Sequence, residues 1–312
     1  MINTEFKSVI ELVKAFPDED TCVKHLEQLR WNGNVVSPFD PSSKVYVCKG
    51  NKYRCKNTGK YFNVRTQTLF DNTKVDLQTW FVAIYLVTAH KKGISSLQLG
   101  RDLNVTQKTA WFMLQRIRNC FGITDNNDED GKLGGGGQAV EVDETYVGGK
   151  LKNMTNSKRK AHKEGKLDSN SNKTPIMGYA VRGGELRLVV VPNRKELMPN
   201  VLQHVSNEAV LITDAAGMYP PIAKYFAGHE VIDHSNQEYV RGSIHTNMIE
   251  GVFSLFDRMV IGTYHYISPK HMQKYADELS FRYNSRDING CARFNLLLKQ
   301  STKRLTYQNL IK

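Results

Sequence analysis

Apolar side chains in the first third of the chain recur mostly at helical spacing. Residues 1–32 carry two such stripes, and a third, strongly apolar one begins at Leu77. Between residues 44 and 64 the spacing changes to short alternating runs, and Gly50-Asn51 separates the first two runs. Alternation around such a dipeptide predicts a β-hairpin. The N-terminal part is therefore predicted to be helical with one small β unit.

Two helices joined by a tight turn are predicted next. Apolar spacing indicates a short helix at 94–103, a turn at 104–106 and a longer helix at 107–118. This order is typical of helix-turn-helix DNA-binding proteins, although a plain helical hairpin has the same outline. Thr106 stands where it can cap the second helix. The candidate DNA contacts on that helix are Lys108, Thr109 and Arg116.

Residues 122–138 are predicted to be a linker, because a run rich in Asp and Asn followed by four glycines cannot bury apolar area. Beyond it, the pattern predicts three strands, a helix, a strand, a helix, a strand and a helix. An RNase-H-like fold has this order of elements, and its first and fourth strands end side by side. The predicted fold class is thus α/β for this region, and α+β for the whole chain.

Two of the predicted strands end in an aspartate. Asp143 interrupts the apolar strand that starts at Ala139, and Asp214 ends the apolar run at 210–213. Glu250 follows on a segment with helical spacing. A carboxylate inside an apolar strand is costly unless it is paired, hydrogen-bonded or bound to metal, although acids at strand ends also form ordinary turns. The repetition favours a site for two divalent metal ions that act on phosphodiesters.

Basic residues exceed acidic ones, which gives the chain a formal net charge of +12. This charge favours a polyanionic partner, most simply nucleic acid, over an ordinary basic enzyme. Residues 150–173 hold a basic run, rich in Asn and Ser, directly after the first acidic strand. Such a run is either a solvated loop or a flexible grip on phosphates. Its candidate DNA contacts are Lys158, Arg159 and Lys160.

Cysteine usage and hydropathy both predict a cytoplasmic protein with no membrane partner. The five cysteines are odd in number and scattered, which is typical of reduced thiols rather than of a disulfide framework. The longest apolar runs, such as 186–191, are far too short to span a bilayer. The N-terminal residues lack the basic start and apolar core of a signal peptide.

The small β unit has the outline of a zinc ribbon, but its ligands are wrong. A ribbon needs two C-x2-C pairs, because four soft donors close a tetrahedral site. Here the pairs would be Ser37 with Asp40, and Cys55 with Thr58. With one good ligand left, or two if Cys48 moves in, we expect the unit to fold without zinc around an apolar core.

With these features, the chain resembles DDE-type insertion-sequence transposases, of the group with an N-terminal zinc-ribbon-like module and an ISXO-like catalytic domain of RNase-H fold. The segments that carry the resemblance are 142–149, 213–214, 245–251, 262–268 and 281–286. Such proteins have a lysine that touches DNA seven residues after the catalytic glutamate. This chain has Asp257 there, and the neighbouring Arg258 is the candidate substitute.

The resemblance implies a division of the chain into five parts. These are N-terminal helices with the degenerate ribbon (1–70), a helix-turn-helix region (71–121), the linker (122–138), the catalytic domain (139–300) and a C-terminal tail (301–312).

It also implies a mechanism at the acidic residues. Two Mg²⁺ (or Mn²⁺) ions would be held by Asp143, Asp214 and Glu250. Asn247 is the alternative third ligand, or a neighbour that orients metal, water or DNA, and His245 is placed to orient a phosphate. The partner would be double-stranded DNA, both element ends and target, bound by a homo-oligomer. Two rivals stay open: a DNA-binding regulator with an inactive nuclease fold, and a host RNase-H-like nuclease.

Overall fold

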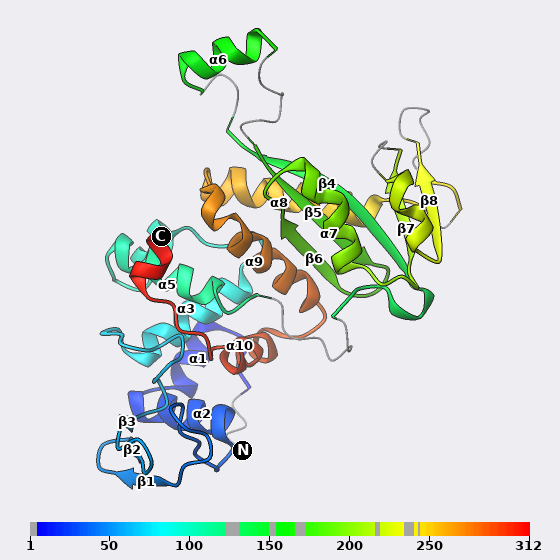
Figure 1. Cartoon of the computed structure of the whole chain (residues 1–312). Coiled ribbons are helices and arrows are strands. Elements are labelled where there is room, and N and C mark those ends of the chain that lie inside the picture. Colours follow the sequence, from blue (N-terminus) through cyan, green and yellow to red (C-terminus); the bar gives the residue numbers. More distant parts are fainter. Residues whose placement is uncertain are drawn as a thin grey trace. The chain divides into compact units, whose positions relative to one another are not determined.

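The computed structural model describes residues 5–122, 131–149, 154–165, 173–215, 219–233, 240–242 and 244–312. The chain forms two compact units (Figure 1): residues 1–122 combine with 285–312 in the first, and 123–284 make up the second. The second unit therefore ends earlier than the catalytic domain predicted at 139–300. Within the described ranges, no helix is both long and apolar enough to cross a membrane.

Helices build most of the first, N-terminal unit. They are α1 (Val9–Ala15), α2 (Glu19–Trp31), α3 (Leu77–Ala89), α4 (Ser96–Asp102), α5 (Gln107–Arg118), α10 (Gly290–Lys299) and α11 (Tyr307–Ile311). Ser8, Asp18 and Asp76 stand immediately before the first three, and the side chain of each accepts a backbone N–H from the first turn. Such caps satisfy N–H groups that have no partner inside the helix, so they fix where each helix begins.

Helix α10 completes the core of this unit from the far end of the chain. Its Phe294 is fully buried, and the Phe294 ring centroid lies 5.3 Å from that of Phe81 in α3. Nε2 of the buried His25 in α2 donates a hydrogen bond of 2.8 Å to Asn295 Oδ1. Apolar burial and ring packing of this kind stabilise a core. Residues 285–312 therefore belong structurally to the unit of the N-terminal helices and not to the second unit.

A three-stranded antiparallel sheet in the order β1-β2-β3 confirms the predicted hairpin and third strand. Its strands are β1 (Val45–Cys48), β2 (Lys52–Cys55) and β3 (Tyr61–Phe62). One face packs against α2, where the Trp31 ring lies 5.2 Å from that of Tyr53 and 6.2 Å from that of Phe62. Aromatic contacts thus join the small sheet to the helices.

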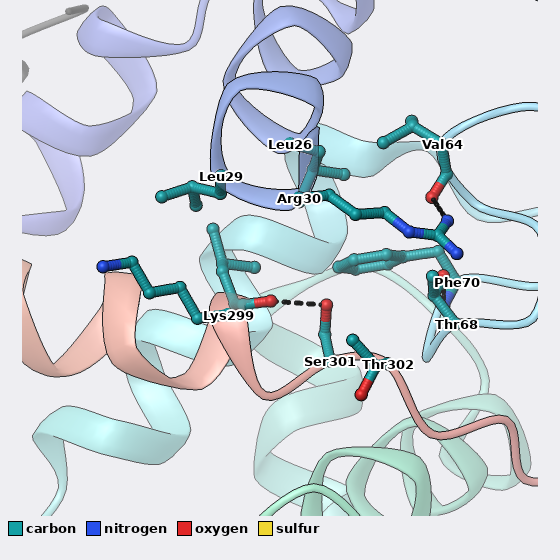
Figure 2. A pocket seen from close by; sticks show the side chains of 10 residues that line it. Leu26, Leu29, Arg30, Val64, Thr68, Phe70, Lys299, Ser301 and Thr302 are labelled. Carbon is teal, nitrogen blue, oxygen red and sulfur yellow. Dashed lines mark hydrogen bonds between the residues drawn. The ribbon is translucent and has the colours of Figure 1, made fainter. Parts of the chain in front are cut away.

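A small cavity of about 100 Å³ in this unit is lined by α2, by the segment after β3 and by the end of α10. Figure 2 shows Arg30 extending along it toward the backbone. Arg30 Nη1 donates to the carbonyl oxygens of Val64, at 2.7 Å, and Thr66, at 3.1 Å. Burial lowers the pKa of this guanidinium. Arg30 therefore links α2 to the segment that follows the small sheet.

The second unit is built on a five-stranded sheet in the order β6-β5-β4-β7-β8. Its strands are β4 (Ala139–Gly148), β5 (Lys173–Val181), β6 (Leu186–Val190), β7 (Val210–Asp214) and β8 (Gly228–Ile232). Strand β4 pairs antiparallel with β5 and parallel with β7. The first and fourth strands of the unit are therefore neighbours. This order confirms the predicted RNase-H-like fold.

Helices cover both faces of this sheet (Figure 1). Helix α7 (Leu197–His204) packs over Val140 and Val142 of β4, whereas α8 (Asn247–Met259) and α9 (Met272–Asn284) pack over the opposite face. Successive strand residues point to opposite faces. The even-numbered residues near the start of β4 therefore face α7, and the odd-numbered ones face α8. A further helix, α6 (Asn156–Lys163), comes between β4 and β5 in the chain.

The segment 122–138 was predicted to be a linker, but its C-terminal end is packed in the structure. Residues 123–130 lie outside the described residues, but Leu133 is buried in the core of the second unit. A Cβ added to Gly134 would stand 2.4 Å from Val140 and 2.7 Å from Ala209, and the φ angle of Gly134 is +80°. Both facts require glycine there. This end of the segment is therefore packed against the sheet.

Candidate active site

Asp143 and Asp214 lie level with each other on neighbouring parallel strands. Glu141 of β4 pairs with Ile212 of β7, and continuing this register by two residues brings Asp143 level with Asp214. Side chains at level positions of parallel neighbours project to the same face of a sheet. The juxtaposition of the two aspartates that the order of elements predicted is thus confirmed.

Asp143 is a partly buried carboxyl group that stands among other acids. Burial raises its pKa to about 7, opposed by the backbone N–H of Glu144, which donates to Asp143 Oδ1 at 2.7 Å. The negative charges of Glu144, Asp214 and Glu250 raise the pKa of Asp143 further. These four carboxyl groups therefore lie within electrostatic reach of one another, from two strands and one helix.

Helix α8 approaches the sheet closely because β5 carries a glycine opposite Asp143. Gly178 pairs with Asp143 in the β4–β5 ladder. A Cβ added to Gly178 would stand 2.3 Å from Ile249 Cδ1 and 2.8 Å from Phe253 Cζ. Close-packed interiors do not absorb such overlaps, so a larger residue would displace α8. Gly178 thus permits the approach that brings the first turn of α8 toward Asp143.

That first turn carries Asn247 and Glu250, both of which are exposed. Residues three apart on a helix share one face. Thr246, buried just before the helix, donates from Oγ1 to Glu250 Oε1 at 2.6 Å. The bond orients Glu250 at the same end of the helix as Asn247. Both residues are therefore placed as the sequence pattern predicted, and both remain candidates for the third ligand.

A second carboxylate on β4, which sequence reasoning missed, fixes the start of α8. Glu141 is fully buried, and its Oε2 accepts the backbone N–H groups of Met248 at 3.0 Å and Ile249 at 3.1 Å. These N–H groups have no partner inside the helix, and a negative charge at a helix N-terminus is stabilising. Glu141 points to the same face of β4 as Asp143. It therefore holds the helix that carries Glu250 against the strand that carries Asp143.

Arg182 and His245 complete the surroundings of Glu141. Arg182 Nε lies 3.3 Å from Glu141 Oε1, and Arg182 Nη2 donates to the carbonyl oxygen of His245 at 3.0 Å. His245 Nδ1 lies 3.4 Å from Glu141 Oε1, which is long for a hydrogen bond. The charged residue between Val140 and Val142 was the available signal for this network, because a buried carboxylate needs partners.

Glu144 lies on the opposite face of β4 from Asp143 and has partners of its own. The hydroxyl of the buried Tyr219 donates to Glu144 Oε2 at 2.7 Å. Burial raises the pKa of Glu144, while the Tyr219 hydrogen bond and the charge of Arg194 lower it. Burial and the charge of Glu144 in turn raise the pKa of Tyr219. Glu144 is therefore engaged in a structural contact and only adds its charge to the acidic cluster.

The donor set at this site suits a hard divalent cation. Mg²⁺ and Mn²⁺ prefer carboxylate and carbonyl oxygens, and these are what Asp143, Asp214 and the first turn of α8 supply. In the described part of the chain, no three acidic, histidine or cysteine side chains stand close enough together to enclose an ion. The residues thus fit such a cation by their chemistry, in an arrangement more open than a closed coordination sphere.

Helix α5 divides its predicted DNA contacts between two faces. The side chain of Thr106 accepts the backbone N–H of Thr109 at 3.2 Å, which confirms the predicted cap, and Lys108 is exposed beside it. Arg116, in contrast, is 7% exposed and donates to two backbone carbonyl groups of its own unit. The structure therefore corrects the prediction for Arg116, because the last turn of α5 faces the interior of the unit.

The other predicted DNA contacts lie on exposed helix surfaces. Lys158, Arg159 and Lys160 are exposed on α6. Arg258 is exposed in the last turn of α8, next to the equally exposed Asp257. Solvent exposure leaves these side chains available to phosphates.

The positions where a zinc ribbon carries its ligands form a polar cluster in the small sheet. They hold Ser37, Asp40, Cys55 and Thr58. Cys55 is fully buried. Burial would raise the pKa of its thiol, but hydrogen bonds from the hydroxyl groups of Ser37, Ser43 and Thr58 lower it to about 6. The chain's own hydroxyl groups thus surround its one remaining ribbon cysteine.

Similarity to known proteins covers both units. Residues 132–284 match the family described as the ISXO2-like transposase domain, and this match includes Asp143, Asp214 and Glu250. The chain is also 27% identical over 259 residues to an uncharacterized protein in transposable element ISH50 of Halobacterium salinarum, covering 79% of this chain and 84% of that protein. No solved structure matches the chain. The family match and the relative agree with the RNase-H-like fold, and residues 132–284 form a domain of the ISXO2-like transposase family.

Proposed function

We propose that this transposase binds the terminal repeats of its insertion sequence, cuts DNA strands there and joins them to target DNA. The observation that carries the proposal is the level placement of Asp143 and Asp214 on neighbouring parallel strands. Glu250 adds a third carboxylate within electrostatic reach, from a different element. Carboxylates gathered in this way from two strands and a helix suit metal-dependent phosphodiester chemistry.

We assign the divalent ions, Mg²⁺ or Mn²⁺, to Asp143, Asp214 and either Glu250 or Asn247. Bound there, two such ions would activate the attacking hydroxyl and stabilise the leaving oxygen. The role of the protein is to hold these oxygen donors in place. The N–H of Glu144 orients the Asp143 carboxylate, and Glu141 fixes the start of α8 and so the position of Glu250.

DNA binding is assigned to basic and polar side chains outside the acidic cluster. Lys108 and Thr109 stand in the first turn of α5, where a helix-turn-helix contacts a groove. The cations on α6 are exposed and suit phosphates. Because two element ends have to be held together to be joined to one target, we propose that the protein acts as a homo-oligomer on DNA.

A gel-shift and cleavage assay on the element's own terminal DNA tests this proposal. Asp143→Asn keeps the size of the side chain but removes a charge that would hold metal. It should abolish Mg²⁺-dependent cleavage and leave binding intact or slightly tighter, since a negative charge near phosphates is gone. Lys108→Ala should weaken binding and lower the salt slope by about one unit. Arg101→Ala, which alters an exposed cation on α4, is the matched control.

Three outcomes would contradict the proposal. Normal cleavage by Asp143→Asn would mean that the metal site lies elsewhere. Wild-type protein that binds the ends but never cuts them would favour a DNA-binding regulator with an inactive nuclease fold. Cleavage of hybrids or junctions without regard to the element's ends would favour an RNase-H-like host nuclease.

A further inference from the structure

Alternate side chains of the small sheet point to its two faces. Tyr53, Cys55 and Phe62 point toward α2 or are buried. The register pairs Tyr46 with Arg54 and Arg54 with Tyr61, so these three form one row across the opposite face. All three are exposed. The face turned away from α2 therefore presents a tyrosine, an arginine and a tyrosine side by side. We refer to it as the outer face of the small sheet.

Cations surround this row. Because strand residues two apart share a face, Lys44, Lys52 and Lys56 accompany Tyr46 and Arg54 on the outer face, and all three lysines are exposed. Residues 44–62 contain no Asp or Glu. Within the described part of the chain, no carboxylate pairs with any of these lysines or with Arg54. The outer face is thus a concentrated patch of positive charge that its own unit does not neutralise.

The two tyrosines are exposed to an unusual degree for aromatic side chains. Tyr46 is 43% and Tyr61 is 61% exposed. Each ring has a cation beside it: Lys44 Nζ lies 5.7 Å from the Tyr46 ring centroid, and Arg54 Cζ lies 5.7 Å from that of Tyr61. Large aromatic side chains at the surface are a common mark of a binding site. The rings offer flat apolar surfaces, and the cations between them attract phosphates.

From this combination we infer that the outer face of the small sheet binds single-stranded DNA. Unpaired bases can stack on Tyr46 and Tyr61 while the backbone passes along Arg54 and the lysines. The bases of a duplex are already stacked on one another and cannot use the rings in this way. Cations alone would suit either form of DNA, so the exposed tyrosines decide between them. This site lies outside both helix α5 and the acidic cluster, and it needs no metal.

Fluorescence anisotropy of a short labelled oligothymidylate tests the inference on the full chain in the presence of EDTA. Tyr46→Ala and Tyr61→Ala should each weaken binding roughly tenfold to a hundredfold, the range expected for loss of one stacked base. Tyr46→Phe and Tyr61→Phe keep the ring and should bind as the wild type does. Lys52→Ala with Lys56→Ala should lower the salt slope by about 0.7 for each phosphate that the protein no longer neutralises.

Two controls separate this site from other parts of the molecule. Lys14→Ala with Lys24→Ala removes the same charge from exposed positions on α1 and α2 and should change neither affinity nor slope. Affinity for a duplex of equal length should be unaltered by the tyrosine variants. Because Tyr46 and Tyr61 are exposed, circular dichroism melts should show unchanged folding.

Two results would overturn the inference. One is an affinity for oligothymidylate that stays within about twofold of wild type in both alanine variants. The other is an equal loss of affinity for oligothymidylate and duplex, which would mean that the outer face contacts a double-stranded backbone. Failure of the variants to cleave, or of the wild type to bind metal, would bear on the acidic cluster and leave this result unaffected.

Discussion

In the small sheet, the buried Cys55 is surrounded by hydroxyl groups, whereas in the five-stranded sheet Asp143 is surrounded by carboxyl groups. The pKa of Cys55 is lowered to about 6, and that of Asp143 is raised to about 7. Hydrogen bonds stabilise a charged group without a metal, while crowded carboxylates repel one another until a cation binds. The neighbours of an ionisable side chain, more than its identity, thus indicate whether its site calls for a metal.

The same contrast recurs two residues apart on β4. Glu141 and Asp143 point to one face of the strand, yet Glu141 has two helix N–H groups and Arg182 as partners. Asp143 has one N–H group and several negative neighbours. One carboxylate therefore stabilises the fold, and the other is costly to the fold and suited to chemistry.

The largest expected effect on stability follows from removing Glu141. Glu141→Ala removes the acceptor of two N–H groups at the start of α8 and one of the partners of the Arg182 guanidinium. Breaking a buried ion pair from one side costs about 3–5 kcal/mol. Calorimetric unfolding should show this loss, and Glu141→Gln, which keeps an oxygen acceptor, should lose less. A Glu141→Ala protein as stable as wild type would remove Glu141 from its positioning role.

A smaller loss is expected from Gly178→Ala. The added Cβ would overlap Ile249 and Phe253 of α8, and overpacking of this kind costs about 1–3 kcal/mol. Gly251→Ala is the matched control, since nothing lies within 4 Å of a Cβ at that exposed helix position. It should stabilise the protein by up to about 1 kcal/mol. Similar effects of both substitutions in calorimetry would show that α8 does not depend on Gly178 for its approach.

Asp143→Asn should raise the stability of the protein, whereas Glu141→Ala and Gly178→Ala should lower it. The pKa of Asp143 is raised from 3.8 to about 7, so its ionisation lowers the free energy of unfolding. This loss is absent below pH 3.8 and complete above pH 7. In EDTA at pH 8, the variant should therefore gain about 0.5–2 kcal/mol. Added Mn²⁺ should raise the unfolding temperature of the wild type more than that of the variant. Equal shifts with Mn²⁺ would mean that Asp143 does not hold the ion.

The smallest effect concerns the pH dependence set by Cys55. A thiol whose pKa is lowered from 9.0 to about 6 contributes stability that is present above pH 9 and is lost as pH falls through 6. Cys55→Ser should flatten this part of the profile, and Cys48→Ser, at a less buried site, should not. All three tryptophans lie within residues 1–122, so their fluorescence reports on this unit. Identical profiles for wild type and Cys55→Ser would contradict the assigned environment.

Local features of this molecule were predictable from the sequence where they depend on neighbours in the chain. Strand β7 ends at Asp214 as the apolar run indicated, and Thr106 caps α5. The order of strands and helices was enough to predict that Asp143 and Asp214 are neighbours. These features rest on periodicity and capping, which act over a few residues.

Features that depend on distant segments were not predictable in this way. The partners of Arg116 include a carbonyl group 189 residues away in the chain, so its position on a helix gave no sign of its burial. The roles of Glu141 and Gly178 arise from the approach of α8, which begins more than a hundred residues after Glu141. The packing of α10 against α3 likewise joins segments about two hundred residues apart in the chain.

Iron-directed cleavage of the polypeptide tests the central claim most directly, namely that one metal site joins β4, β7 and α8. With added hydrogen peroxide and ascorbate, Fe²⁺ bound in place of Mg²⁺ reduces the peroxide to hydroxyl radicals, which cut the backbone nearest the ion, and mass spectrometry identifies the cuts. The account predicts cuts next to Asp143, Asp214 and Glu250 in the wild type, suppressed by excess Mg²⁺ and absent in Asp143→Asn. Cuts confined to one of these segments, or unchanged in Asp143→Asn, would contradict it.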